Sequence, residues 1–414
     1  MPSSAATQSK HRLGTARSAV EASAVRLCES VRHLVQEPPG LDVDEWEEQL
    51  LCLVDECIES GNDDVLAAAL DKCAEEERAF EQLLFHIEDA AANPIVNVDD
   101  KLVDARLIAI PILLTSRSDV RGGRFERSAN FEALCHSTER AGLIGPRGSV
   151  VFMNYLYHSR ELSELPPSRV SHLAQGILDA RTGKERVSRT TLGQRGWPSQ
   201  GKVPKGASMV MLCYLLAVVL DDPKATRIPA GTSETEAARR RAHAEQWREI
   251  ADPLVAGALD MENGAAHVLG FEPFHEGLRR GLTSYLDMNL HCELAGALVA
   301  RGMQPKALSV VISAHGDKSC VSEVHVSASS RLDGALILGH VLPVDGLDDA
   351  LEAFTRIGHC LNAVGVEEVA IVSEVQPLHA DDDSGERVFL ATKVVEADTG
   401  DAPMPEGQGA RRFH

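Results

Sequence analysis

The sequence predicts an α+β fold: a helical N-terminal domain followed by mixed or antiparallel sheets with packed helices, with duplicated ferredoxin-like α/β sandwiches as one option. Three observations support this prediction. Residues 15–92 carry apolar side chains at helical spacing. After Pro94 the pattern changes to short apolar runs typical of buried strands. In the C-terminal part these runs flank single helices or follow one another across short turns, which favours a mixed or antiparallel sheet.

The length of 414 residues predicts two to three domains. Apolar residues make up 44% of the chain and charged residues 25%, an ordinary globular composition that excludes a wholly disordered chain or a collagen. The pattern divides the chain into a disordered tail (1–14), an acidic helical domain (15–93), a first α+β domain (94–260) with a basic loop (182–206), a second α+β domain (261–396) and a flexible tail (397–414).

Three or four packed helices are expected in the helical domain. The first begins at Thr15 and runs to about Gln36, and later helices begin at Asp44 and at Asp63 or Asp64. The last ends at about residue 92. Residues that break helices separate these segments, namely Pro38-Pro39-Gly40, Gly61-Asn62 and Pro94.

In the first α+β domain, residues 106–116 (RLIAIPILLTS) are predicted to form a buried strand. Pro111 within this run suits an edge strand or a bulge better than a central strand. The later elements are predicted at residues 128–142 (helix), 149–158 (strand), 167–181 (helix), 207–220 (strand), 233–259 (helix) and 268–274 (a candidate strand).

The second α+β domain has the clearest pattern. Its elements are predicted at residues 275–301 (helix), 307–314, 321–329 and 335–344 (strands), 346–364 (helix), and 369–375 and 387–396 (strands). A helix with adjacent Cys and His, followed by a strand that ends at a His, occurs at residues 135–158, 291–315 and 358–379. This repeated pattern indicates either a duplicated α-turn-β unit or a chance coincidence, since the chain has nine Cys and sixteen His in total.

The chain carries 41 basic and 62 acidic residues, for a net charge of −21. The acidity is regional, because residues 37–104 contain twenty-one Asp or Glu and three Lys or Arg. This segment is either a solvated helical surface or a docking face for a basic partner. An acidic segment repels phosphate backbones, which argues against nucleic acid as the main partner.

Cysteine usage and the absence of targeting features predict a cytoplasmic protein with no membrane association. The nine cysteines include no CxxC and lie mostly in apolar segments, as reduced buried thiols do. The first residues, MPSSAATQSKHRLG, lack the apolar core of a signal peptide, and the apolar run 207–220 is too short to span a bilayer. In the adjacent Cys-His pairs, neighbours point to different sides of a helix, so we expect no metal or cofactor there.

The best candidate for a ligand site is the loop between the predicted strand 106–116 and the following helix. Glycines allow main-chain N–H groups to face an anion, and the positive end of a helix reinforces such binding. A phosphate or carboxylate would fit, although the loop matches neither a P-loop nor G-x-G-x-x-G. The alternative is a surface loop paired with acidic helices. The anion-binding candidates are Arg117, Arg121, Gly122, Gly123, Arg124 and Ser128.

The second candidate is the basic loop 181–205. A structureless loop of this length is uncommon in a compact domain and is often functional or disordered. Docking on the acidic region 37–104, within the chain or between protomers, is one interpretation, nucleic-acid binding is another, and an inert loop is a third. The candidate interaction residues are Lys184, Arg186, Arg189, Arg195, Trp197, Lys202 and Lys205.

The third candidate is the group of polar residues around His315. A metal site or a nucleophile–base pair can be drawn from His315, Asp317, Ser319, Cys320, Glu323 and His325. No HExxH or HxH occurs, so a polar turn with ordinary hydrogen bonds is the preferred interpretation. The sequence therefore predicts no catalytic residue and no metal ligand.

Several stretches resemble an uncharacterised family of proteobacterial proteins that carry a domain of unknown function. They are residues 40–71 (GLDVDEWEEQLLCLVDECIESGNDDVLAAALD), 106–117 (RLIAIPILLTSR), 334–344 (GALILGHVLPV) and 365–372 (GVEEVAIV). The resemblance implies N-terminal helices, a buried proline-containing strand and a C-terminal set of strands around one helix. The family also has a cysteine pair near the C-terminus, where this chain has residues 376–379 (QPLH) and no cysteine. The resemblance implies no activity.

Together these observations favour a non-catalytic cytoplasmic assembly or adaptor protein that binds protein partners and forms a homo-oligomer. The alternative is an enzyme or sensor that binds a phosphorylated or carboxylate small molecule at the loop 117–128. Nucleic-acid binding through residues 181–205 is the third option.

Overall fold

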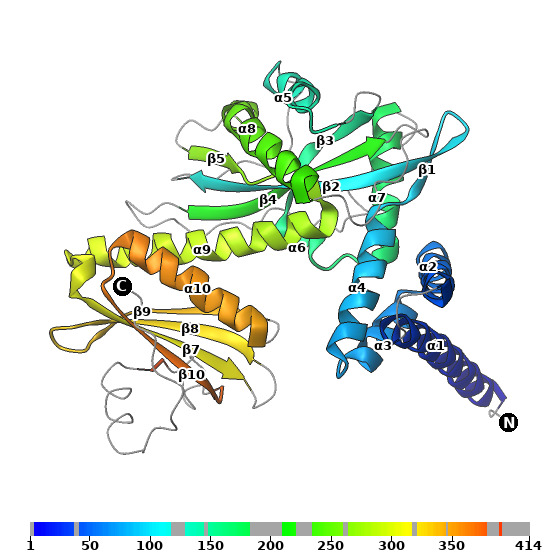
Figure 1. Cartoon of the computed structure of the whole chain (residues 1–414), viewed down its shortest axis with the longest axis horizontal. Helices are drawn as coiled ribbons and strands as arrows, with labels where there is room; N and C mark the ends of the chain where they lie inside the picture. The colour runs from blue at the N-terminus through cyan, green and yellow to red at the C-terminus, as the bar shows by residue number, and fades with distance from the viewer. Residues whose placement is uncertain are drawn as a thin grey trace. The chain divides into compact units, whose positions relative to one another are not determined.

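The computed structural model describes residues 4–36, 41–116, 129–144, 148–182, 209–220, 234–259, 264–316, 321–344, 347–378 and 389–390. The chain forms two compact units, the first containing Met1–Lys202 and Met211–Gly281 and the second Val203–Val210 and Leu282–His414 (Figure 1). The division falls inside one helix, α9 (Phe274–Arg301). The predicted boundary at 260/261 falls within the first unit.

Four helices begin the first unit, as predicted: α1 (Ser4–Gln36), α2 (Leu41–Ser60), α3 (Asp63–Cys73) and α4 (Glu77–Ala92). Leu27, Leu50, Leu66 and Leu83 are fully buried in these helices. The α1 helix begins at Ser4 instead of near Thr15, because the segment before Thr15 contains the good helix formers Ala, Gln, Lys, Arg and Leu. Basic residues of α1 pair with acidic ones, as Arg32 does with Glu76.

The sheet of the first unit contains six strands: β1 (Ile95–Val98), β2 (Lys101–Ser116), β3 (Ser149–His158), β4 (Met209–Leu220), β5 (Gly264–Val268) and β6 (Glu272–Pro273). The order is β1-β2-β4-β3, and β5 and β6 pair with β2 on the same edge as β1. The helices between these strands are α5 (Ala129–Arg140), α6 (Ser159–Leu162), α7 (Pro167–Thr182) and α8 (Glu234–Ala258).

This unit contains a ferredoxin-like sandwich. Its strand order is β5-β2-β4-β3, with α5 following β2 and α8 following β4. The two helices cover one face of the sheet, where Leu134 of α5 and Trp247 of α8 join the core residues of β2 and β4. The predicted α+β class with mixed or antiparallel sheets is therefore confirmed.

The other face of this sheet is also covered, which explains why β2 and β4 are almost continuous apolar runs. Two glycines let the start of α9 approach closely. A Cβ atom on Gly277 would lie 2.3 Å from the carbonyl oxygen of Ala109, and one on Gly281 would lie 2.5 Å from the hydroxyl of Tyr214. That hydroxyl donates a hydrogen bond to the carbonyl of Leu278 at 2.9 Å.

Pro111 lies in a central strand, and the pairing of β2 shows how it is tolerated. Along one edge of β2, β6 pairs with residues 108–109 and β5 pairs with residues 112–116. Pro111 occupies the gap between them, and its carbonyl accepts a hydrogen bond from the N–H of Leu269 at 2.8 Å. A strand residue directs its N–H and C=O to the same side, so the missing N–H of Pro111 faces this gap and no hydrogen bond between β2 and β4 is lost.

The β1–β2 hairpin is an element that the sequence analysis did not predict. Asp99 and Asp100 form its two-residue turn, with φ values of 50° and 63°. Such a turn matches the twist of paired strands, and Asp tolerates positive φ better than most residues do. The candidate strand 268–274 is replaced by β5 and β6, which are separated by the break that accommodates Pro111.

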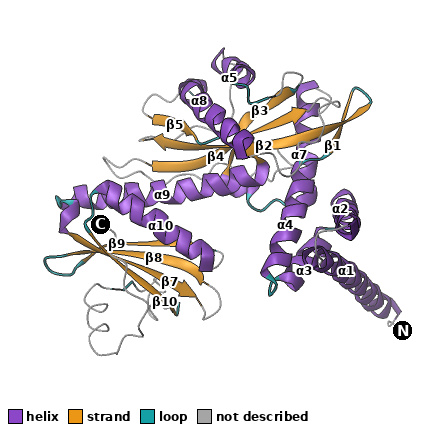
Figure 2. Ribbon diagram, viewed as in Figure 1, coloured by secondary structure: helices purple, strands orange, loops and turns teal. Residues whose placement is uncertain are grey.

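The second unit has a four-stranded sheet made by β7 (Leu308–Gly316), β8 (Val321–Ser330), β9 (Leu336–Pro343) and β10 (Glu368–Gln376) (Figure 2). A short 3₁₀ turn (Pro305–Ala307) precedes β7, and α10 (Leu347–Val364) connects β9 to β10. The order is β10-β7-β8-β9, and only the β10–β7 pair is parallel. This order differs from that of the first unit, so the two sheets are not copies of one sandwich.

Both helices of the second unit pack on one face of its sheet. Leu294 and Leu298 of α9 and Phe354, Ile357 and Leu361 of α10 form a core with alternate residues of the strands. On β7 and β8 these residues are Leu308, Val310, Ile312 and Ala314, and Val324, Val326 and Ala328. The intervening residues belong to the opposite face. Among the helices that the structure describes, none combines the length and apolarity needed to traverse a bilayer.

Candidate functional site

The face of the second sheet opposite α9 and α10, here named the polar face, carries the densest group of buried polar side chains in the described chain. Its members come from alternate positions of β7 and β8, since side chains alternate along a strand. All are buried except Glu323, which is half-buried. They are Ser309, Ser313, His315, Glu323, His325, Ser327 and Ser329.

Ser313 and His315 form a hydrogen-bonded pair. The hydroxyl of Ser313 lies 2.9 Å from Nε2 of His315, and Nδ1 of the same ring lies 3.3 Å from the carbonyl oxygen of Pro377. A carbonyl only accepts, so Nδ1 carries the proton and Nε2 of the neutral ring accepts from the hydroxyl. A hydroxyl that donates to an imidazole nitrogen is the arrangement found between a nucleophile and its general base. Ser313 is fully buried, however, so its hydroxyl is not presented to a substrate.

His325 stacks on His315, with ring centroids 3.8 Å apart and planes 17° apart. The register opposes Ser313 to His325 and His315 to Glu323, which brings these groups together. Nε2 of His325 donates to Oε2 of Glu323 at 2.8 Å. The remaining Nδ1 of His325 is buried without a hydrogen-bond partner, and so is the hydroxyl of Ser327.

Phe389 lies against the polar face at the edge of β9. Its ring centroid is 5.3 Å from that of His325. A Cβ atom on Gly339 would meet this ring at 2.4 Å, so only glycine leaves room for it. The register pairs Gly339 with Ser327, which places this space beside the unpartnered hydroxyl. We name the position that His325 and Gly339 offer to an aromatic ring the aromatic seat.

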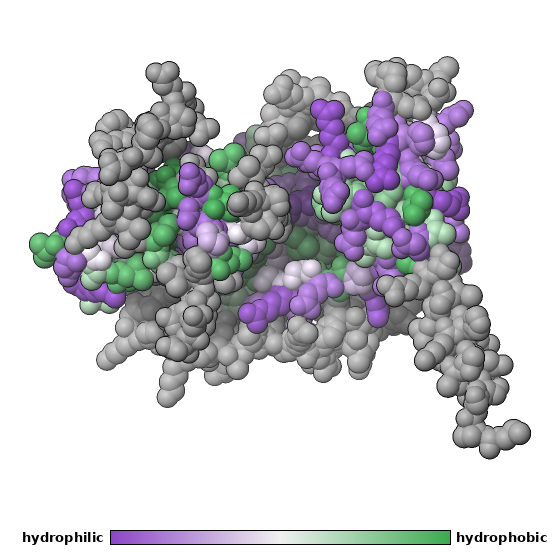
Figure 3. Space-filling model, turned by 90° about the horizontal axis from the view of Figure 1, so that it is seen from below, coloured by the Kyte–Doolittle hydropathy of each residue, from purple (hydrophilic) through white to green (hydrophobic). Residues whose placement is uncertain are grey.

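Strand β9 is an edge of the sheet, because no described strand pairs with its outer side. Its sequence, LILGHVLP, contains no Asp, Glu, Lys or Arg. Two large apolar side chains near its start are exposed: the exposed fraction is 96% for Leu332 and 50% for Leu336. Hydrophobic side chains (green) also reach the surface in the view of Figure 3, on the left side of the molecule.

On the helix face of the same strand, His340 binds α9. Its Nδ1 lies 2.8 Å from Oε2 of Glu293, and this hydrogen bond lowers the pKa of Glu293. Nε2 of His340 is buried and has no hydrogen-bond partner. The pKa of the Cys360 thiol is raised, mainly by burial and further by Asp287 and Cys292. No group of three or more His, Cys, Asp or Glu among the described residues is arranged to hold a metal ion.

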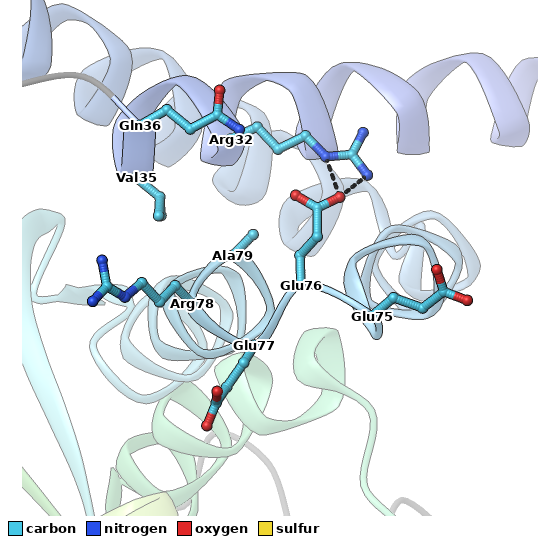
Figure 4. A pocket seen from close by; sticks show the side chains of 8 residues that line it. All are labelled: Arg32, Val35, Gln36, Glu75, Glu76, Glu77, Arg78 and Ala79. Carbon is cyan, nitrogen blue, oxygen red and sulfur yellow. Dashed lines mark hydrogen bonds and ion pairs between the residues drawn. The ribbon is translucent and has the colours of Figure 1, made fainter. Parts of the chain in front are cut away.

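The first unit has a pocket of about 390 Å³ between α1 and the start of α4 (Figure 4). The ion pair between Arg32 and Glu76 lies on one side of it, where Nε of Arg32 is 2.8 Å from the carboxylate. Acidic side chains outnumber basic ones in its lining, so it does not suit an anion. The lining residues are Arg32, Val35, Gln36, Glu75, Glu76, Glu77, Arg78 and Ala79.

The two loops singled out from the sequence lie outside the described residues. The elements that flank them are those predicted: β2 ends at Ser116 and α5 begins at Ala129, whereas α7 ends at Thr182 and β4 begins at Met209. The anion-binding candidates from Arg117 to Ser128 and the interaction candidates from Lys184 to Lys205 therefore remain predictions. Asp317, Ser319 and Cys320 also lie outside the described residues.

Three of the residues around His315 do come together, but on paired strands and not in a turn. The alternation of Val and polar residues in VSEVHVSASS indicates a sheet with one polar face. Sequence reasoning missed Ser313, Gly339 and Phe389, because only tertiary pairing brings them to His325. Of these, Gly339 within an apolar strand is a signal that another group approaches the backbone closely.

One family matches the chain over residues 14–414, and its description reads "Protein of unknown function (DUF2863)". No characterised protein and no solved structure compared with the chain shows a significant match.

Proposed function

Since the chain belongs to the DUF2863 family of proteins of unknown function, we propose, from its own features, that it is a non-catalytic cytoplasmic assembly or adaptor protein that self-associates through the edge strand β9. The observation that carries this proposal is the uncharged outer edge of β9.

Edge strands expose unpaired main-chain N–H and C=O groups, which can pair with another chain. Proteins that remain monomeric commonly block such edges with a charged side chain, a bulge or an inward-pointing charge. β9 carries no charged side chain over its eight residues, and its proline, Pro343, stands at the very end. Its register shift, at Ile337, lies near the start of the strand and leaves the residues from Leu338 onward in regular pairing. The exposed side chains of Leu332 and Leu336 add apolar area next to this edge.

A second copy of the chain is the simplest partner for this edge. Two β9 strands paired antiparallel around a two-fold axis would join the sheets of two protomers. Such an isologous contact closes on itself and ends at a dimer. It also buries Leu336 of both protomers, which no intramolecular contact does in the described structure.

Light scattering coupled to size exclusion tests this proposal. The wild type is expected at twice the chain mass of 44.7 kDa. Leu336→Lys should shift the mass to that of the monomer, because a charge at the edge must be desolvated on pairing. Leu351→Lys is the matched control: it is exposed to 53%, lies on α10 and should keep the wild-type mass. A monomeric wild type, or equal masses of both variants, contradicts the proposal.

A second candidate function is binding of a phosphorylated or carboxylate small molecule at residues 117–128. The observation that favours it is the order of elements around this loop: the loop follows the end of β2 and leads into the N-terminus of α5. The N-terminus of a helix is a common binding site for anions. A thermal-shift panel of nucleotides and sugar phosphates tests it. Stabilisation that disappears in Arg124→Ala supports this candidate, and the absence of any stabilisation rejects it.

A further inference from the structure

We propose that Cys28 and Cys73 are a redox-active thiol pair, which closes to a disulfide on sustained exposure to hydrogen peroxide and fastens α1 to α3. The two cysteines lie in the helical part of the first unit, where α1 and α3 pack side by side (Figure 1). The pair belongs to the first unit and the proposed self-association to the second, so either can fail without the other.

The two sulfur atoms are already in contact. Sγ of Cys73 donates a hydrogen bond to Sγ of Cys28 at 3.2 Å, and Sγ of Cys28 donates to the carbonyl oxygen of Ala69 at 3.2 Å. A disulfide bond is about 2.05 Å long, so the two side chains together need to move by only about 1 Å. Both residues are fully buried, which keeps a bulky thiol of another protein away and favours reaction of the two cysteines with each other.

The pocket between α1 and the start of α4 brings small molecules close to the pair (Figure 4). Arg32, which lines it, is one helical turn beyond Cys28. Glu75, also in its lining, is two residues beyond Cys73. Nη2 of Arg32 lies 3.5 Å from the carbonyl oxygen of Lys72, the residue before Cys73. The pocket volume of about 390 Å³ is ample for a molecule as small as hydrogen peroxide.

The surroundings of the pair make the reaction slow. The pKa of the Cys73 thiol is raised to about 12, mainly by burial and further by its hydrogen bond to Cys28, whereas the positive charge of Arg32 acts in the opposite direction. The thiolate is the reactive form of cysteine, and little of it is present at neutral pH when the pKa is so high. The pair therefore suits a response to prolonged oxidation, and not the fast detection of a peroxide pulse.

The reaction consumes one molecule of hydrogen peroxide. One cysteine, as thiolate, attacks a peroxide oxygen; the O–O bond breaks, hydroxide leaves and a sulfenic acid remains. The sulfur of the second cysteine then attacks the first sulfur, so that the S–O bond breaks and the S–S bond forms. The departing hydroxide takes the proton of the second thiol. Overall the two thiols lose two electrons and two protons, and the peroxide is reduced to two molecules of water.

The disulfide would close a long loop. Its ends are 45 residues apart, and the loop contains all of α2 and α3. A cross-link of this kind removes conformational freedom from the unfolded chain, and more so for a longer loop. In the reduced protein, exposed ion pairs flank the same contact, such as that between Lys72 and Glu21. The oxidised protein should therefore hold α1 more firmly than the reduced protein does.

Peptide mapping of the full-length protein tests the proposal. The reduced protein is treated with hydrogen peroxide, unfolded, alkylated with iodoacetamide and digested with trypsin. Each cysteine of the pair is released in its own short peptide, residues 27–32 and 73–78, because basic residues flank both. The main disulfide product should be these two peptides linked together, and dithiothreitol should separate them. Full alkylation of both cysteines after the treatment, or sulfinic acids without the link, overturns the proposal.

Three variants locate the reaction. Cys28→Ala and Cys73→Ala should each abolish the linked product. Cys57→Ala is the matched control, because it removes another buried thiol of the same helices whose pKa is also raised by burial, and it should leave the yield unchanged. An equal loss of the linked product in Cys57→Ala overturns the direct pairing. If a variant of the pair does not fold, the mapping of the wild type still decides.

Thermal unfolding of the oxidised and the reduced wild type tests the fastening itself. Oxidation should raise the midpoint of the helical part by several degrees, and dithiothreitol should reverse the increase. An unchanged midpoint in a protein that carries the link overturns the fastening of α1 to α3.

Discussion

The indole N–H of Trp247 donates a 2.7 Å hydrogen bond to the hydroxyl of Ser137. Trp247 of α8 is fully buried, and Ser137 lies on α5, so this bond joins the two helices that cover the ferredoxin-like sheet. The hydroxyl in turn donates to the carbonyl of Leu134, one turn earlier on α5.

Ser137→Ala is expected to lower the free energy of unfolding by about 1–3 kcal/mol, because it leaves a buried N–H without a partner. Trp247→Phe removes the donor and some packing. The double variant should be less destabilised than the sum of the single variants, since no orphaned N–H remains. Urea unfolding of the four proteins measures this, and strictly additive effects would show that the bond contributes nothing.

Two glycines of α9 should respond oppositely to the same substitution. Gly277→Ala places a methyl group 2.3 Å from the carbonyl oxygen of Ala109 and should destabilise the first unit by about 1–3 kcal/mol. Gly296→Ala meets no atom within 4 Å and should stabilise the helix by about 0.5–1 kcal/mol. Thermal unfolding of both variants tests the pair, and equal shifts of the midpoint would refute the close approach of α9 to β2.

Acidification is expected to destabilise the helical part of the first unit through His86. This residue is buried in α4, and burial lowers its pKa in the folded protein. Nε2 of His86 lies 2.9 Å from the amide nitrogen of Gln82, which only donates, so the folded state needs the neutral ring. Below the unfolded pKa of about 6.5 the unfolded chain binds a proton that the folded chain does not, so stability falls as the pH falls.

The measurement is urea unfolding between about pH 5 and pH 8. His86→Leu should flatten the pH dependence in the range between the lowered folded pKa and the unfolded value. His291→Leu replaces an exposed histidine of α9 and should retain the wild-type profile. An unchanged slope in His86→Leu would mean that another group carries the acid sensitivity.

Most of the helices and strands could be predicted from local patterns, because each depends on neighbours in sequence. Strand β3 begins and ends at the predicted residues 149 and 158, and α7, α9 and α10 agree to within a residue or two. The β1–β2 hairpin was missed because Asp99-Asp100 is a weaker turn signal than Asn-Gly or Asp-Gly. The break between β5 and β6 was missed because it accommodates Pro111, which lies in β2, far away in the sequence.

The candidate site, unlike the helices and strands, could not be predicted from local patterns. His315, Glu323 and His325 stood out in the sequence as chemically capable residues, but nothing local indicated whether they formed a turn, a metal site or a sheet face. The antiparallel register of β7 and β8 decided this, by opposing His315 to Glu323 and stacking the two imidazoles. Phe389 entered the site from far along the chain, where no local pattern relates it to Gly339.

The sequence by itself determined the α+β class, the order of helices and strands, and the polar and apolar faces of β8, since periodicity and chain breakers act over a few residues. Only the tertiary structure decided the ferredoxin-like order of the first sheet, the different order of the second, and the open edge of β9. These depend on which strands pair, and pairing is set by packing between segments that are distant in the chain.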